Sequence, residues 1–178
     1  MNIACKSSGV AHLWSTDDAA AFGQASAILD NAFVIHYLRV SDTTANHDVA
    51  LVVVDAAHNV PAAEALAQAV DEEFGGGSRR FLVIGMQDGR NPVSVLTALD
   101  AASYEVVVAC TAPTWRGVDA EILAEAAETV GARCDVIADV EAALDHAVSL
   151  ASADDLVVVA GSTSVIARVL APSADGHD

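Results

Sequence analysis

The chain has 178 residues, 53% of them hydrophobic, and a formal net charge of −17 that comes from eight Lys and Arg residues against 25 Asp and Glu residues. This length and apolar content suffice for one domain with its own core and argue against intrinsic disorder. The acidic balance excludes a nucleic-acid-binding surface, because phosphate contacts need a basic patch.

Neither a membrane-spanning segment nor a signal peptide is expected. No apolar run reaches the roughly 18 residues of a spanning helix, and no apolar stretch follows Lys6. The cytoplasm is therefore the expected location. Cys5, Cys110 and Cys134 are odd in number and far apart, which favours reduced thiols. The six histidines lack metal-ligand spacing, so no metal site is expected from this chain alone.

The first 49 residues lack the regular pattern of the rest. Ser15-Thr16-Asp17-Asp18 is a helix-start signal and predicts a helix to about Asn31. Residues 1–32 are accordingly predicted to form a helical appendage, for which a hinge remnant is one interpretation. Residues 33–40 are predicted to form a strand, with an edge position as one option, before a polar turn.

From residue 50 onward, short apolar runs alternate with amphipathic stretches. The runs are Val-rich and lack polar alternation, which is typical of strands covered on both faces of a parallel sheet. The predicted strands are Ala50–Val54, Phe81–Met86, Val106–Cys110, Cys134–Ala138 and Leu156–Ala160.

Helices are predicted at residues 61–74, 118–130 and 140–150, where apolar residues recur at helical spacing. In the second of these, Ile122 is expected in the apolar stripe. Strand–helix alternation at this spacing implies right-handed crossovers. The predicted fold is α/β, with a doubly wound, mostly parallel Rossmann-like sheet of about six strands in residues 33–171 and a frayed tail at 172–178.

Ligands of open parallel sheets bind beyond the carboxyl ends of the strands, and polar residues gather at those ends here. Asp55, His58 and Asn59 follow the first strand of the regular part. The later strands are followed by Gln87-Asp88-Gly89-Arg90, by Thr111 to Arg116, by Asp139 and by Gly161-Ser162-Thr163-Ser164.

Each candidate also has a structural interpretation. Asn59 and Ser162 are typical N-caps of the helices that follow them. Asp55 can satisfy loop amides, and His58 can be a loop histidine bonded to the backbone. Arg116 can be an ordinary surface residue. Because a cap can also contact a ligand, both interpretations stay open.

Several common site types are missing their defining residues. The chain contains no G-x-x-x-x-G-K-[ST] loop, and no G-x-G-x-x-G follows the first strand. The stretch 161–165 lacks the second glycine of a nucleophile elbow. The glycines of 75–77 follow a helix rather than a strand, so they do not fit a phosphate cradle.

The segment from Val53 to Asn59, followed by 62–66, resembles the D-x-A-H-N segment that opens the C-terminal domain of Mur-type ligases. The similarity is greatest to the bifunctional folylpolyglutamate synthase/dihydrofolate synthase branch. Further similar segments follow in the family's order, and together they span about residues 33–170: Leu82–Met86, Thr114–Gly117 with 119–123, and Val159–Ser162.

The resemblance implies a role in joining glutamate to a carboxylate with ATP, through an acyl-phosphate. In that family a central domain carries the P-loop and the magnesium ligands, and the C-terminal domain closes over the nucleotide. Asp55 and His58 would then face the ATP and glutamate cleft as catalytic and cofactor-binding residues. Asn59, Ser162 and Arg116 would bind substrate. ATP and magnesium would be held mainly by a domain absent from this chain.

The chain departs from the family pattern at Val60, which separates Asn59 from Pro61, and at Asp88-Gly89-Arg90-Asn91, which lacks the lysine of an Asp-Lys-Asp segment. No residues match the family's central domain, so we expect a ligase lid domain, as a fragment, a truncated product or half of a split enzyme, inactive without a separate ATPase-core chain. Its expected small-molecule partners are glutamate and a folate-type acceptor. The alternatives are a non-catalytic ligand-binding or regulatory module, and an unrelated doubly wound protein that shares the motif by chance.

Overall fold

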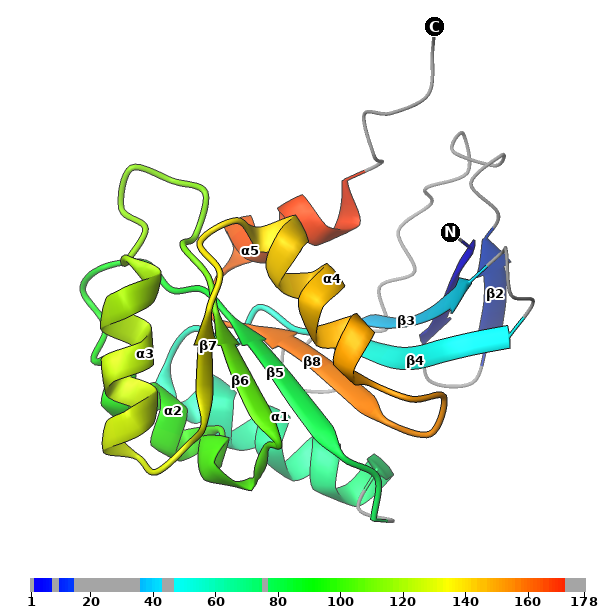
Figure 1. Ribbon diagram of the computed structural model, residues 1–178, viewed down its shortest axis with the longest axis horizontal. Coiled ribbons are helices and arrows are strands. Elements are labelled where there is room, and N and C mark those ends of the chain that lie inside the picture. Colours follow the sequence, from blue (N-terminus) through cyan, green and yellow to red (C-terminus); the bar gives the residue numbers. More distant parts are fainter. Residues whose placement is uncertain (1, 8–9, 15–35, 43–46, 75–76, 172–178) are drawn as a thin grey trace, which may run out of the picture.

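The computed structural model describes residues 2–7, 10–14, 36–42, 47–74 and 77–171, and before Ala50 it describes the backbone alone. Eight strands of this part form one mixed sheet in the order β2-β1-β3-β4-β8-β5-β6-β7 (Figure 1). The strands are β1 (Asn2–Ser7), β2 (Val10–Trp14), β3 (His36–Asp42), β4 (His47–Val54), β5 (Arg80–Ile84), β6 (Val106–Ala109), β7 (Cys134–Val136) and β8 (Leu156–Ala160).

The last five strands in this order, β4-β8-β5-β6-β7, are all parallel, and β3 joins them antiparallel to β4. Helices cover both faces of the parallel part, as the doubly wound prediction requires (Figure 1). They are α1 (Val60–Phe74), α2 (Pro92–Ala98), α3 (Ala120–Thr129), α4 (Val140–Leu150) and α5 (Thr163–Leu170), with a short 3₁₀ helix, η2, at Ala101–Ser103.

Two apolar layers, one on each face of the sheet, explain why the strands lack polar alternation. Leu82 and Ile84 of β5 lie in the layer shared with α1, α2 and α3, whereas Phe81 and Val83 lie in the layer shared with α4 and α5. All four side chains are at most 1% exposed. Successive residues of a strand point to opposite faces, so a strand covered on both sides must be apolar at every position.

The N-terminal part differs from the prediction. Residues 2–7 and 10–14 form strands where a helical appendage was expected, which raises the sheet from about six strands to eight. Strand β3 lies between β1 and β4 and is therefore not an edge strand. The helix expected at 15–31 and the tail at 172–178 lie outside the described residues, and the domain boundaries remain predictions.

Two further differences concern helices. Helix α2 was not predicted, although Asn91 caps it by accepting from Ser94 N at 3.1 Å and Pro92 begins it. Ile122 was placed in the apolar stripe of α3 but is 49% exposed, because the buried side of that helix is centred on Leu123 and Ala127. In the described ranges, no helix is both long and apolar enough to cross a membrane.

Candidate functional site

The strand order brings the predicted site residues to one edge of the sheet. The carboxyl ends of β4 and β8 are neighbours, with Val54 paired to Val159. After β4 the chain enters α1 on one face of the sheet, and after β8 it enters α5 on the other face. Adjacent strands whose helices leave to opposite faces open a crevice at their carboxyl ends, where ligands of this fold class bind.

Asp55 extends β4 into this edge. Its backbone N–H donates to Val159 O at 3.0 Å, and its Oδ1 accepts from Ala57 N at 2.7 Å. The residue is 3% exposed, and Oδ2 is buried with no hydrogen-bond partner among the described residues. Burial raises the pKa of Asp55 to about 6, against the opposing effects of the Ala57 hydrogen bond and His58. A buried oxygen without a donor is costly, and a ligand could supply that donor.

His58 and Asn59 occupy the start of α1. His58 is exposed, and its Nδ1 lies 2.9 Å from Ala56 O, so this nitrogen carries the proton and donates. Nε2 then accepts, at 3.4 Å from Asn59 Nδ2. Asn59 Oδ1 accepts from Ala62 N at 3.0 Å, which confirms the N-cap interpretation of Asn59. Both ring nitrogens of His58 therefore have partners within the turn that starts α1.

Ser162 caps α5 and also contacts a residue that the sequence did not link to it. Its Oγ accepts from Ser164 N at 3.2 Å and from Gln87 Nε2 at 3.2 Å, and it lies 2.8 Å from Ser164 Oγ. Gln87 follows β5, so this bond joins the ends of two adjacent strands. The N-cap interpretation of Ser162 is confirmed, and Gln87 joins the candidate site.

Arg116 is held by a neighbouring loop. Its Nε lies 2.5 Å from Asp88 Oδ1, and its Nη2 donates to Asp88 O at 3.2 Å. The guanidinium also lies 5.8 Å from the ring centroid of Trp115, which is 92% exposed. Both ionic side chains are largely exposed, so the pair fixes the loop more than it stabilises the fold.

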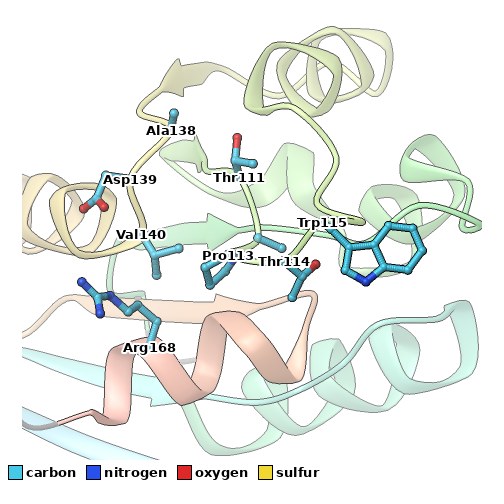
Figure 2. Close-up of a pocket in the computed structure, with 9 residues that line it drawn as sticks. Thr111, Pro113, Thr114, Trp115, Ala138, Asp139, Val140 and Arg168 are labelled. Carbon is cyan, nitrogen blue, oxygen red and sulfur yellow. The ribbon is translucent and has the colours of Figure 1, made fainter.

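A cavity of about 540 Å³ opens at the carboxyl ends of β6 and β7. Figure 2 shows Asp139 and Arg168 on one side of it and Trp115 on the other, with the indole ring directed away from the remaining lining side chains. Asp139 Oδ1 caps α4 by accepting from Ala142 N at 2.9 Å, and Arg168 pairs with Glu141 at 3.2 Å. Asp55, His58 and Ser162 do not line this cavity.

The predicted residues thus share one edge but form separate contact groups. Asp55, His58 and Asn59 lie together at the start of α1, and Ser162 lies with Gln87 and Ser164. Arg116 belongs to a third group with Asp88 and Trp115. The Gln87–Ser162 bond spans 75 residues of sequence and has no local signal that could have revealed it.

The described residues do not make a metal site by themselves. They contain no group of three or more His, Cys, Asp or Glu side chains placed to hold a metal ion. The unpartnered Oδ2 of Asp55 is one oxygen of the kind that magnesium prefers, but one ligand is not a site.

Comparison with known proteins agrees with this fold. The model of the family described as Mur ligase, glutamate ligase domain, matches residues 39–163. The chain belongs to this family. The interpretation as an unrelated protein with a chance motif is therefore wrong.

Among its relatives is a probable bifunctional folylpolyglutamate synthase/dihydropteroate synthase of Halobacterium salinarum, 33% identical over 156 residues that cover 84% of this chain and 18% of the relative. The structure of E. coli FolC in complex with DHPP and ADP is 30% identical, with a TM-score of 0.64 over 82% of this chain and 31% of that chain. A bifunctional folylpolyglutamate synthase/dihydrofolate synthase with Mn, AMPPNP and L-glutamate bound is 28% identical, with a TM-score of 0.60 over 74% of this chain and 29% of that chain. The chain therefore spans less than a third of the length of these relatives.

Proposed function

We propose that this chain is the lid domain of an ATP-dependent ligase that joins glutamate to a carboxylate, of the folylpolyglutamate/dihydrofolate synthase type. The observation that carries the proposal is the position of Asp55, His58 and Ser162. They follow β4 and β8, which are neighbours, and they lie at the edge of the sheet where ligands of this fold class bind. Relatives with this domain have been seen with ADP, AMPPNP, Mn and L-glutamate bound.

The groups at this edge suit the positioning of charged reactants. His58 lies at the N-terminus of α1, where the free amides of the helix favour an anionic oxygen. The carboxylate of Asp55 places negative charge at the same edge, which favours the ammonium group of an incoming amino acid. Phosphoryl transfer depends on such positioning and charge stabilisation, which a closing lid can complete.

The nucleotide phosphates and the divalent cation need further residues. This chain has no P-loop sequence, and the described residues lack a metal cluster. We therefore assign ATP and magnesium to a nucleotide-binding core outside this chain, in which the folate-type acceptor also finds contacts. The chain alone is expected to be inactive.

Reconstitution with such a core tests the proposal. The chain is mixed with a separately produced P-loop-containing core of the folylpolyglutamate synthase type, and ADP release is followed with ATP, magnesium, glutamate and dihydropteroate. We expect turnover only when the chain and the core are mixed. The rate should fall about tenfold or more for His58→Ala, because positioning groups contribute at least this much. Glu64→Ala, on the exposed side of α1, is the matched control. An ATP-binding core that gains no ligation from the chain would contradict the proposal.

A second candidate is a non-catalytic ligand-binding or regulatory module that keeps the ligase fold. Its supporting observation is the segment 88–91, which lacks the expected lysine and whose Asp88 is engaged by Arg116. Calorimetry of the isolated chain with ATP and glutamate, separately and together, separates the two candidates. Tight nucleotide binding by the isolated chain supports the module, whereas weak or undetectable binding fits a lid without its core.

A further inference from the structure

The hydroxyl of Ser162 is restricted in what it can do. A serine hydroxyl has two acceptor lone pairs and one proton. Both lone pairs of Ser162 Oγ are engaged, one by Gln87 Nε2 and one by Ser164 N, each at 3.2 Å. The remaining contact, to Ser164 Oγ at 2.8 Å, leaves the donor open by geometry alone, and the two engaged lone pairs assign the donation to Ser162.

This fixes the direction of a short hydrogen-bond chain. The side-chain amide of Gln87 donates to Ser162 Oγ, and the hydroxyl of Ser162 donates to Ser164 Oγ. Ser162 is 3% exposed, whereas Ser164 is only partly buried and lies at the outer end. The hydroxyl proton of Ser164 is thus left to donate outward, and each bond of such a chain strengthens the next.

The backbone around Gln87 is held on both sides. Met86 O accepts from Val118 N at 2.9 Å, and Asp88 N donates to Arg116 O at 2.8 Å. Gln87 itself forms an antiparallel bridge with Gly117. The amide of Gln87 is therefore presented to Ser162 from a fixed position rather than from a free loop.

We propose that Gln87 is a positioning residue, which orients the Ser162–Ser164 pair so that Ser164 donates to an anionic oxygen of the ligand at this edge. The ligand oxygen belongs to a carboxylate or a phosphate, since an outward donor rejects an ammonium group. The identity of the ligand as glutamate or a nucleotide rests on the proposed function. The end of the neighbouring strand β4 has the opposite preference, because the carboxylate of Asp55 places negative charge there.

The hydrogen bond from Gln87 to Ser162 can be tested without any ligand. In the ¹H–¹⁵N spectrum of the full chain, the side-chain amide resonances of Gln87 should shift in Ser162→Ala and stay in place in Thr163→Ala. Thr163 is an exposed neighbour on the same helix turn and serves as the matched control. Unchanged Gln87 resonances in Ser162→Ala would overturn the proposal, because Gln87 would then not donate to Ser162.

Ligand class is tested by titrating the ¹⁵N-labelled chain with L-glutamate, with inorganic phosphate and with the neutral analogue glutaramide. We expect the backbone amide resonance of Ser164 to shift with at least one of the two anions and to shift at most weakly with glutaramide. A shift with glutamate alone indicates that the ligand oxygen belongs to a carboxylate, and a shift with phosphate alone indicates that it belongs to a phosphoryl group. Ser164→Ala and Gln87→Met should weaken binding of the anion that shifts the Ser164 resonance by about tenfold, the effect of one hydrogen bond to a charged group. Ser164→Thr, which keeps the hydroxyl, should restore it, and Thr163→Ala should bind like the parent chain.

A Ser164 amide that ignores both anions, or a Ser164→Ala variant that binds like the parent, would overturn the inference. These results are separable from the fate of the ligase proposal. Ligation with a core that is unaffected by Gln87→Met would remove the inference alone. If phosphate shifts the Ser164 resonance but the chain restores no ligation to a core, the ligase proposal alone would be removed.

Discussion

Gly161 and Gly85 lie so close at the ends of β8 and β5 that a Cβ atom at Gly161 would be 2.6 Å from the carbonyl oxygen of Gly85. Gly161 also has a φ of +106°, which side-chain-bearing residues rarely adopt. Any side chain here would push apart the two strand ends that carry Ser162 and Gln87. The close approach of these strands therefore depends on glycine at position 161.

Gly161→Ala is expected to destabilise the chain by about 2–5 kcal/mol, the sum of left-handed strain and a backbone clash. Gly131→Ala is the matched control, since Gly131 has a φ of +84° but no atom within 4 Å of a Cβ. It should cost about 1–2 kcal/mol from strain alone. Urea unfolding followed by circular dichroism measures both. Equal losses would show that contact with Gly85 plays no part.

The carboxyl of Asp55 should make stability depend on pH. Burial raises its pKa to about 6, above the ordinary 3.8, so the folded chain takes up this proton before the unfolded chain does. The parent chain therefore gains stability from this group as the pH falls from about 7 to 4, and loses it as the pH rises.

Asp55→Asn removes that titration. Its unfolding free energy relative to the parent should be higher at pH 8 than at pH 4 by about 3 kcal/mol, the equivalent of roughly two pKa units. Asp145→Asn, at an exposed position of α4, is the control. A difference between Asp55→Asn and the parent that does not change with pH would contradict the assignment.

Asp155 is expected to hold the opposite end of the sheet together. Its carboxylate accepts from Arg79 Nη2 at 2.5 Å, from Ser152 N at 2.7 Å and from Arg79 N at 3.2 Å. Burial by itself would raise the pKa of Asp155, but these bonds outweigh it and hold the pKa below its usual range. Asp155→Asn should lower the melting temperature by roughly 3–6 °C, because it leaves donors without their acceptor. Asp154→Asn, its exposed neighbour, should leave the melting temperature unchanged.

The net charge of −17 should make the chain more stable in salt. Like charges repel each other more in the compact state than in the unfolded chain, and the screening length falls from about 10 Å at 0.1 M to about 3 Å at 1 M salt. The melting temperature should rise by several degrees between 0.05 M and 1 M NaCl. A similar rise in KCl would identify screening as the cause, and a flat or falling melting temperature would count against self-repulsion.

The parallel part of the fold could be predicted because its information is local. Runs such as Leu156–Ala160 show in five letters that both faces of the strand are covered. Helix α2 was missed because seven residues give too short a periodic pattern, although Asn91 and Pro92 carried the start signal. Strands β1 and β2 have no comparable apolar run, and their pairing with β3 joins distant segments.

The site was predictable at the level of strand ends and not at the level of contacts. Asp55 and Ser162 were identified because polar residues that follow buried strands stand out. That Asp55 is buried and His58 exposed, three residues later, depends on the turn into α1. The bond from Gln87 to Ser162 depends on β8 lying beside β5, which the order of the strands in the chain does not reveal.

The position of β8 has a consequence for synthesis of the chain on the ribosome. β8 is the last strand of the described residues to be made, yet it lies between β4 and β5, which do not pair with each other. Until residues 156–160 emerge, the nascent chain holds two separate half-sheets, each with an unpaired edge. The sheet can then close only in a late step. A stop codon before β8 would therefore leave one truncated chain with two separate, aggregation-prone half-sheets in place of a smaller folded domain.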